Sequence, residues 1–248
     1  MKLTFVYPNI YRINKRRDFS GICIQRKMLD DVFGFAYDMC FGDGHHRGYR
    51  TGGQYSRKKG ELFCNTFQGK LAEVMVHSVL TTAGITCNEP DFGIYGEGIW
   101  DDSDIEANGK KISIKSAAFF SNLLLLETKD WDDTGRYIPN IGKGSTEIYD
   151  YFVLVRISPD IKKLFRDKRM LFSNEIPKGT IQDLIHEQSW MYDIAGYINN
   201  DVLRDIIREK CILPQNALLN GSTKMDAENY YIQSGYMNPV EELIAALI

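Results

Sequence analysis

Residues 103–117 read SDIEANGKKISIKSA, and this stretch decides the fold that the sequence predicts. Asn108-Gly109 lies between two runs in which apolar and polar residues alternate. Asn-Gly is the strongest short-range signal for a two-residue hairpin turn, because both central turn positions need a positive φ. The sequence therefore predicts two antiparallel strands joined at Asn108-Gly109.

The position of the turn fixes which residues face each other. Cross-strand partners have numbers that sum to 217, as 108 and 109 do, so Asp104 is expected opposite Ser113 and Asp102 opposite Lys115. Side chains two positions apart share a face of a strand, so all four are expected to project together. A carboxylate that holds Mg²⁺ and an amine that orients or deprotonates water suit phosphodiester hydrolysis. The alternative is a solvated hairpin whose Asp and Lys only pair across strands.

The segments around the hairpin complete a mixed α/β pattern. Residues 64–83 have helical periodicity, with Asn65 or Thr66 as the cap. Residues 123–126 and 151–157 are expected to form strands, the second of them buried on both faces.

Helical patterns dominate from Thr180 onward, and the last residues, NPVEELIAALI, have the pattern of a short amphipathic helix. We therefore expect one domain over residues 1–248, with a catalytic core at about 61–175 and a helical C-terminal portion at about 178–248.

The hairpin and the helix before it resemble the PD-(D/E)XK nuclease superfamily, which includes most type II restriction enzymes and the archaeal Holliday-junction resolvases. The family pattern is a helix that carries a Glu, then an Asp on one hairpin strand opposite the acid of (D/E)-x-K. Residues 69–85, GKLAEVMVHSVLTTAGI, resemble the helix, with Glu73 as its acid. Asp104 matches the hairpin aspartate and Lys115 the motif lysine. The resemblance, over roughly 65–157, implies a restriction-endonuclease-like mixed β-sheet core flanked by helices, with terminal additions for DNA recognition and dimerisation.

Ser113 departs from the family pattern, because the family has an acid there. Some restriction enzymes resemble this arrangement, with S-x-K on the hairpin and a Glu further downstream. Glu127 follows Lys115 at such a distance, and Glu73 is the other candidate. The resemblance thus implies Asp104, Lys115, Glu127 and Glu73 as catalytic residues, Mg²⁺ ligands from Asp104, Glu127, Glu73 and the Ile114 carbonyl, and supporting roles for Ser113 and Asp102. Pro90-Asp91 spells the literal PD but is expected to make a turn; the alternative is that Asp91 binds the metal.

A loop rich in glycine and basic residues, 41–60, precedes the helix. Basic residues among glycines and tyrosines suit contacts to DNA phosphates and grooves, and a solvated loop is the alternative. The expected DNA-binding residues are Arg47, Arg50, Arg57, Lys58 and Lys59. The polar and aromatic segment 224–238 is a second candidate, either for base contacts or for a dimer interface.

Composition excludes several classes of protein. The five cysteines are dispersed without a CxxC pair, which indicates reduced thiols and a cytoplasmic location. No apolar run approaches the roughly 20 residues that span a bilayer. No Walker A loop, GxSxG, dinucleotide fingerprint or HExxH motif occurs. The net charge of −3 neither favours nor excludes nucleic acid.

We therefore expect a Mg²⁺-dependent type II restriction endonuclease that cuts double-stranded DNA as a homodimer, because two active sites are needed for two strands. One alternative is a structure-specific repair or recombination nuclease of the same fold. Another is a catalytically inactive DNA-binding homologue that has lost the motif acid at Ser113.

Overall fold

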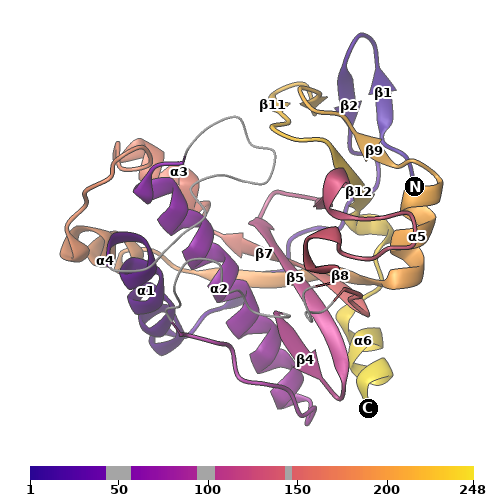
Figure 1. The fold of residues 1–248 in the computed structure, drawn as a ribbon. Coiled ribbons are helices and arrows are strands. Elements are labelled where there is room, and N and C mark those ends of the chain that lie inside the picture. The colour runs from indigo at the N-terminus through magenta and orange to yellow at the C-terminus, as the bar shows by residue number, and fades with distance from the viewer. Residues whose placement is uncertain (43–56, 94–103, 143–146) are drawn as a thin grey trace.

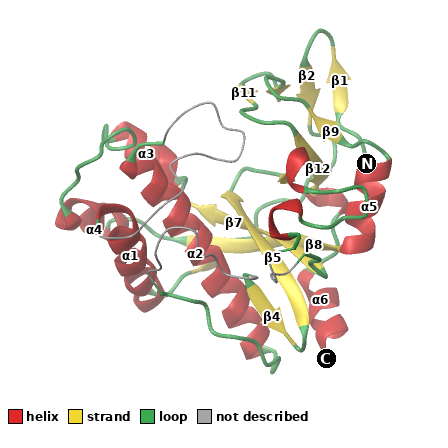
Figure 2. Ribbon diagram, in the orientation of Figure 1, coloured by secondary structure: helices red, strands yellow, loops and turns green. Residues whose placement is uncertain are grey.

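The computed structural model describes residues 1–42, 57–93, 104–142 and 147–248, and it is a mixed α/β fold (Figures 1 and 2). In Figure 1, helices α1 to α4 gather on one side of the molecule. Most of the small strands and α5 gather on the other side, and the long strands β5, β7 and β8 run between them. The fold thus has a central sheet with a different covering layer on each face.

The central sheet has the strand order β3-β8-β7-β5-β4. Strands β5 and β7 are parallel, and every other neighbouring pair is antiparallel. As predicted, β7 is buried along almost its whole length. The five strands are β3 (Ile22–Cys23), β4 (Ile105–Ala107), β5 (Lys110–Ala118), β7 (Tyr151–Ser158) and β8 (Met191–Asn199).

One face of this sheet packs against α1 (Arg26–Phe41) and α2 (Lys59–Thr82). Their apolar side chains share a core with the even-numbered residues Ile112 and Ile114 of β5 and with odd-numbered residues of β7 such as Val153. The other helices are α3 (Ile161–Asp167), α4 (Lys178–His186), α5 (Asn200–Arg208) and α6 (Val240–Leu247).

The opposite face is covered by a second core cluster, which joins Phe152 and Leu154 of β7 to leucines of β6. Two small sheets build this side, with the orders β6-β12-β9 and β1-β2-β10-β11. Their strands are β1 (Thr4–Val6), β2 (Ile10–Arg12), β6 (Leu123–Glu127), β9 (Ile212–Leu213), β10 (Leu218–Leu219), β11 (Thr223–Lys224) and β12 (Asn229–Gln233).

Two expectations about elements are wrong. Helix α2 begins at Lys59, so Asn65 and Thr66 lie inside it and do not cap it. The C-terminal portion is not mainly helical, because it contains β8 and four shorter strands. Strand β8 contains Asp193, and Arg156 of the neighbouring strand β7 neutralises its charge. This contact depends on the tertiary structure, so the sequence alone does not show that Asp193 can lie in a buried strand.

Buried side chains fill most of the segment 224–238, because β12 is the middle strand of its sheet. Within the described ranges, no helix combines the length and apolar character that a bilayer crossing requires.

Candidate active site

The β4–β5 hairpin forms as the sequence predicts. Asn108 and Gly109 have φ values of 47° and 74°, which are the two positive values that a type I′ turn needs. The strand pairs are Ile105 with Ile112, Glu106 with Lys111 and Ala107 with Lys110, so the numbers of each pair sum to 217. The predicted register is therefore confirmed.

Asp104 lies directly before β4, and its side chain forms hydrogen bonds with β5. Its Oδ2 accepts a hydrogen bond of 2.5 Å from the Ile114 amide and one of 3.3 Å from the Ser113 hydroxyl. The N–H and C=O of a strand residue point to the same side of the strand. The Ile114 carbonyl therefore faces the edge that Asp104 occupies.

Lys115 lies two positions after Ser113 and shares its face of β5. In register beside these two residues are Phe152 and Leu154 of β7, which belong to the second core cluster. Among the described residues, nothing forms a hydrogen bond or an ion pair with the Lys115 ammonium. Asp104, Ser113 and Lys115 thus line the face of the central sheet opposite α2.

Glu127 ends β6, whose leucines belong to the same core cluster as Phe152 and Leu154. Its side chain is only 13% exposed, and its Oε2 lies 3.2 Å from Lys129 Nζ. The structure therefore places Glu127 in the layer that covers the Lys115 face.

Glu73 lies on the other side of the central sheet. Helix α2 meets β5 through Gln68, whose Nε2 donates to Ser116 Oγ at 3.3 Å, and Ser116 points to the face opposite Lys115. Glu73 is five residues further, or about 140° around the helix from Gln68. Its carboxylate pairs with buried Lys70, whose ammonium lies 5.1 Å from the centre of the Phe35 ring of α1.

These placements separate the predicted metal ligands. Over residues 1–42, 57–93, 104–142 and 147–248, no three His, Cys, Asp or Glu side chains are grouped to hold a metal ion. Asp104, Glu127 and Glu73 therefore do not assemble as one set, because the central sheet lies between Glu73 and the hairpin face. Asp102, Arg47 and Arg50 lie outside the described residues.

The remaining predicted residues have definite places. Asp91 accepts a hydrogen bond of 2.7 Å from the Gly93 amide, which is the expected turn. Arg57 and Lys58 directly precede α2, and Lys59 is its first residue. Arg57 Nε lies 4.0 Å from Glu61, one turn into the helix.

Sequence reasoning missed Asp150, which anchors the hairpin. Its carboxylate accepts hydrogen bonds of 2.9 Å from the Lys111 amide and 3.0 Å from Lys110 Nζ. The hydrogen bond that the Lys110 ammonium donates to Asp150 raises the pKa of Lys110. The sequence feature that could have indicated this role is an Asp directly before the strand 151–158, because that strand, β7, is the parallel neighbour of β5.

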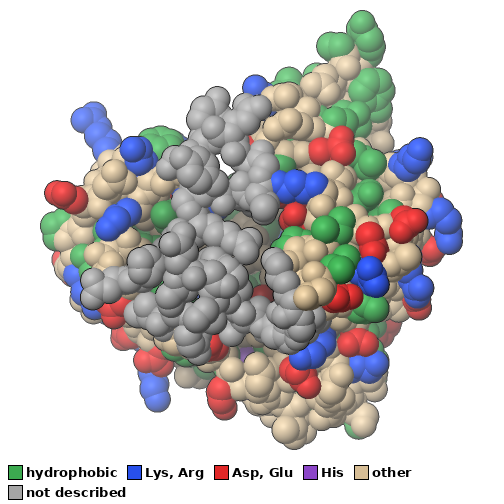
Figure 3. Space-filling model, viewed as in Figure 1, with side chains coloured by type: hydrophobic (Ala, Val, Ile, Leu, Met, Phe, Trp, Pro, Cys, Tyr) green, Lys and Arg blue, Asp and Glu red, His purple; other side chains and the backbone are tan. Residues whose placement is uncertain are grey.

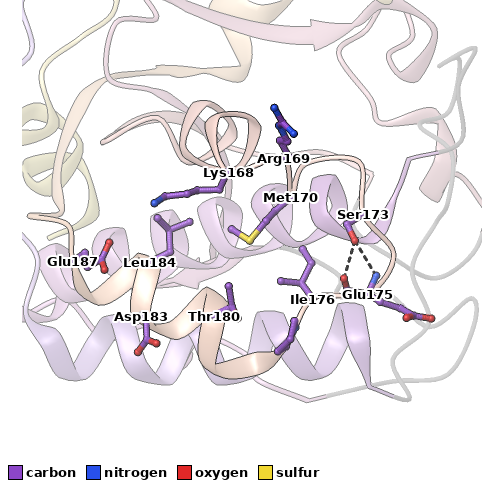
Figure 4. Close-up of a pocket in the computed structure, with 11 residues that line it drawn as sticks. Lys168, Arg169, Met170, Ser173, Glu175, Ile176, Thr180, Asp183, Leu184 and Glu187 are labelled. Atoms are coloured by element: carbon purple, nitrogen blue, oxygen red, sulfur yellow. Dashed lines mark hydrogen bonds between the residues drawn. The ribbon is translucent and has the colours of Figure 1, made fainter.

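A pocket of about 490 Å³ lies away from the hairpin, between the segment after α3 and helix α4 (Figure 4). None of the predicted site residues lines it. Comparisons with protein-family models, curated proteins and solved structures found no match for this chain. The class that the structure itself defines is a mixed α/β protein whose central sheet carries Asp104 and Lys115 on one face of the β4–β5 hairpin.

Proposed function

We propose that this chain is a Mg²⁺-dependent DNA endonuclease whose chemistry lies on the β4–β5 hairpin. The observation that carries the proposal is the position of Asp104, locked onto Ser113 and Ile114, on the same face of the sheet as Lys115. A carboxylate and an ammonium group on one face of a strand pair suit phosphodiester hydrolysis, in which a water molecule attacks phosphorus.

The donor set fits a magnesium ion. Mg²⁺ keeps several waters and usually takes only one or two protein carboxylates together with substrate phosphates, so it does not need a cluster of three acids. Asp104 and the Ile114 carbonyl would hold it at the hairpin edge. When bound, the ion polarises the phosphate and lowers the pKa of a bound water.

Lys115 has the second role. Its ammonium has no partner among the described residues, so it is available to orient the attacking water and to offset charge on the phosphate. A salt bridge between Lys115 and a neighbouring acid would have favoured the alternative, a solvated hairpin without a catalytic role.

Glu127 is the acid that we assign as the replacement for the motif carboxylate missing at Ser113. Its strand covers the face that Lys115 occupies, whereas Glu73 lies across the sheet.

The specific form that we propose is a type II restriction enzyme that acts on double-stranded DNA as a homodimer. This form rests on the resemblance of the S-x-K hairpin with a downstream Glu to some restriction enzymes, and on the need for two active sites to cut both strands.

The test is incubation of the purified protein with plasmid and phage DNA in Mg²⁺ or in EDTA, with the variant Asp104→Asn and the control Glu106→Gln. Glu106 is a hairpin acid that pairs with Lys111 at 2.6 Å. Discrete fragments that require Mg²⁺, vanish with Asp104→Asn and persist with Glu106→Gln are the expected result.

Other outcomes separate the alternatives. If the protein cleaves only branched or nicked DNA, the proposal of a restriction enzyme is wrong and a structure-specific nuclease is favoured. Tight DNA binding without any Mg²⁺-dependent cleavage would contradict the nuclease proposal.

A further inference from the structure

A dense group of basic residues surrounds α3 and the start of α2, and most of it lies outside the predicted DNA-binding set. Residues 57–61 and 160–169 contain eight Lys or Arg and three Asp or Glu, a net charge of +5 in a chain whose total is −3. We call this the α3 basic surface; its cations are Arg57, Lys58, Lys59, Lys162, Lys163, Arg166, Lys168 and Arg169.

The two parts of the surface are joined by direct contacts. Glu61 lies between them, 4.0 Å from Arg57 Nε and 3.7 Å from Lys162 Nζ. The Gly60 amide donates to the Ser173 carbonyl at 2.9 Å, just after the basic run ends. A side chain at Gly60 would meet the Met170 carbonyl oxygen at 2.1 Å, so only glycine allows this close approach.

Several of these cations are exposed and unpaired. Lys163 pairs with Asp167 at 2.6 Å, but within the described ranges Arg166, Lys168 and Arg169 form no ion pair. Figure 3 shows Lys and Arg side chains at the upper left, where α3 lies in Figure 1.

The acids inside this run neutralise only part of it, since Asp167 pairs with Lys163 and Glu61 lies beside Lys162. Lys168 and Arg169 line the pocket of Figure 4 together with Asp183 and Glu187. Figure 4 shows Arg169 pointing away from both acids. Exposed cations at this density repel one another unless anions are near, so their clustering indicates an anionic partner.

We infer that the α3 basic surface binds the phosphate backbone of a DNA duplex. The inference rests on the proposed nuclease function and assigns its substrate a second contact surface. Helix α3 follows β7 directly, and β7 is the parallel neighbour of the strand that carries Lys115. A phosphate backbone presents a line of charges, which matches cations spread over two adjoining elements better than a single small anion does.

The test compares two triple variants that remove equal charge. Arg166→Gln, Lys168→Gln and Arg169→Gln remove cations from the α3 basic surface. Arg204→Gln, Arg208→Gln and Lys210→Gln remove three exposed cations from the end of α5. Each set contains one residue with a positive φ, Arg169 at 58° and Lys210 at 52°, and in the α5 set Arg204 and Arg208 also pair with Asp201 and Asp205. Duplex binding is measured in EDTA, which stops Mg²⁺-dependent cleavage, over a series of NaCl concentrations.

The α3 variant is expected to bind at least about tenfold more weakly, and its slope of log K against log [NaCl] should be smaller by about 2 to 3. The α5 variant should retain wild-type affinity and slope. If the wild type cleaves DNA in Mg²⁺ but both variants bind equally well, the inference is wrong and the proposed function stands. If the wild type neither binds nor cleaves DNA, both are wrong. Binding of the wild type to phosphatidylserine vesicles but not to DNA would also overturn the inference.

Discussion

The Ile114 amide donates a hydrogen bond of 2.5 Å to the Asp104 carboxylate across the two strands of the hairpin. This bond and the Ser113 hydroxyl hold one carboxylate oxygen, Oδ2, in place. A carboxylate fixed in this way on a rigid sheet loses little freedom when it binds a cation or positions water. Ser113 therefore has a structural role, because its hydroxyl helps to fix the acid opposite it.

Substitution of Glu127 is expected to separate the two candidate acids. Glu127→Gln should lower the rate of DNA cleavage by about 100-fold or more, because a carboxylate beside the reacting phosphate is lost. Glu73→Gln should retain activity within a few-fold, since Glu73 lies on the far side of the central sheet. Single-turnover cleavage of one duplex measures both rates. The reverse order of sensitivity would show that α2 supplies the acid.

The buried pair Arg156–Asp193 is expected to dominate the stability of the central sheet. Arg156 is 1% exposed, and it donates to both oxygens of Asp193 at 2.9 and 2.5 Å and to the carbonyls of Arg17 and Asp18. Arg156→Met leaves Asp193 as an uncompensated buried charge, which should lower the free energy of unfolding by about 3–5 kcal/mol.

Urea denaturation measures this difference, with the exposed Arg204→Ala as the control for loss of charge. A loss of less than about 1 kcal/mol for Arg156→Met would show that the pair contributes no more than a surface ion pair.

None of the five cysteines, all of which the structure describes, forms a disulfide, and they are expected to differ in reactivity. Burial raises the pKa of Cys40 to about 12 and also raises the pKa of Cys64, Cys87 and Cys211. Thiols with raised pKa values stay protonated at about pH 8 and react slowly. Cys23 is exposed on the edge strand β3 and should be alkylated first. Mass spectrometry after brief iodoacetamide treatment gives the order, and rapid labelling of buried Cys64 would contradict it.

Asp132 is expected to make stability fall in acid. Burial would raise its pKa, but hydrogen bonds from Arg136 and Thr134 outweigh burial and lower the pKa from 3.8 to about 2. A lowered folded-state pKa stabilises the fold above the unfolded-state value, and this stability is lost as pH falls from about 4 to about 2.

Thermal unfolding over that pH range should show a smaller loss of Tm for Asp132→Asn than for the wild type. The exposed neighbour Asp133 gives the control Asp133→Asn. Equal losses of Tm in the wild type and Asp132→Asn would contradict the role assigned to these hydrogen bonds.

The sequence predicts best where local geometry decides the structure. Asn108-Gly109 determines a turn and a register, so the strand pairs of β4 and β5 and the meeting of Asp104 with Ser113 followed without tertiary information. The apolar run 151–157 likewise predicts a buried strand because of its composition.

The sequence predicts poorly where distant residues decide the structure. Which face of the sheet α2 covers depends on packing with α1 and β5, so the position of Glu73 relative to the hairpin could not be read from spacing. Residues 191–199 fall in the stretch expected to be mainly helical, but they form β8, in which Arg156 compensates the charge of Asp193. The basic run 162–169 was visible, but only the fold joins it to Arg57–Lys59.

The most direct test of the central claim is the rate of Mg²⁺-dependent DNA cleavage by Lys115→Met beside that by Lys110→Met. Both variants remove one ammonium from β5, but Lys110 is exposed and pairs with Asp150 at the hairpin tip. The proposed chemistry predicts that Lys115→Met loses cleavage by about 100-fold or more while Lys110→Met retains it. Wild-type cleavage that survives Lys115→Met undiminished, with the fold intact, would contradict a nuclease site on this hairpin.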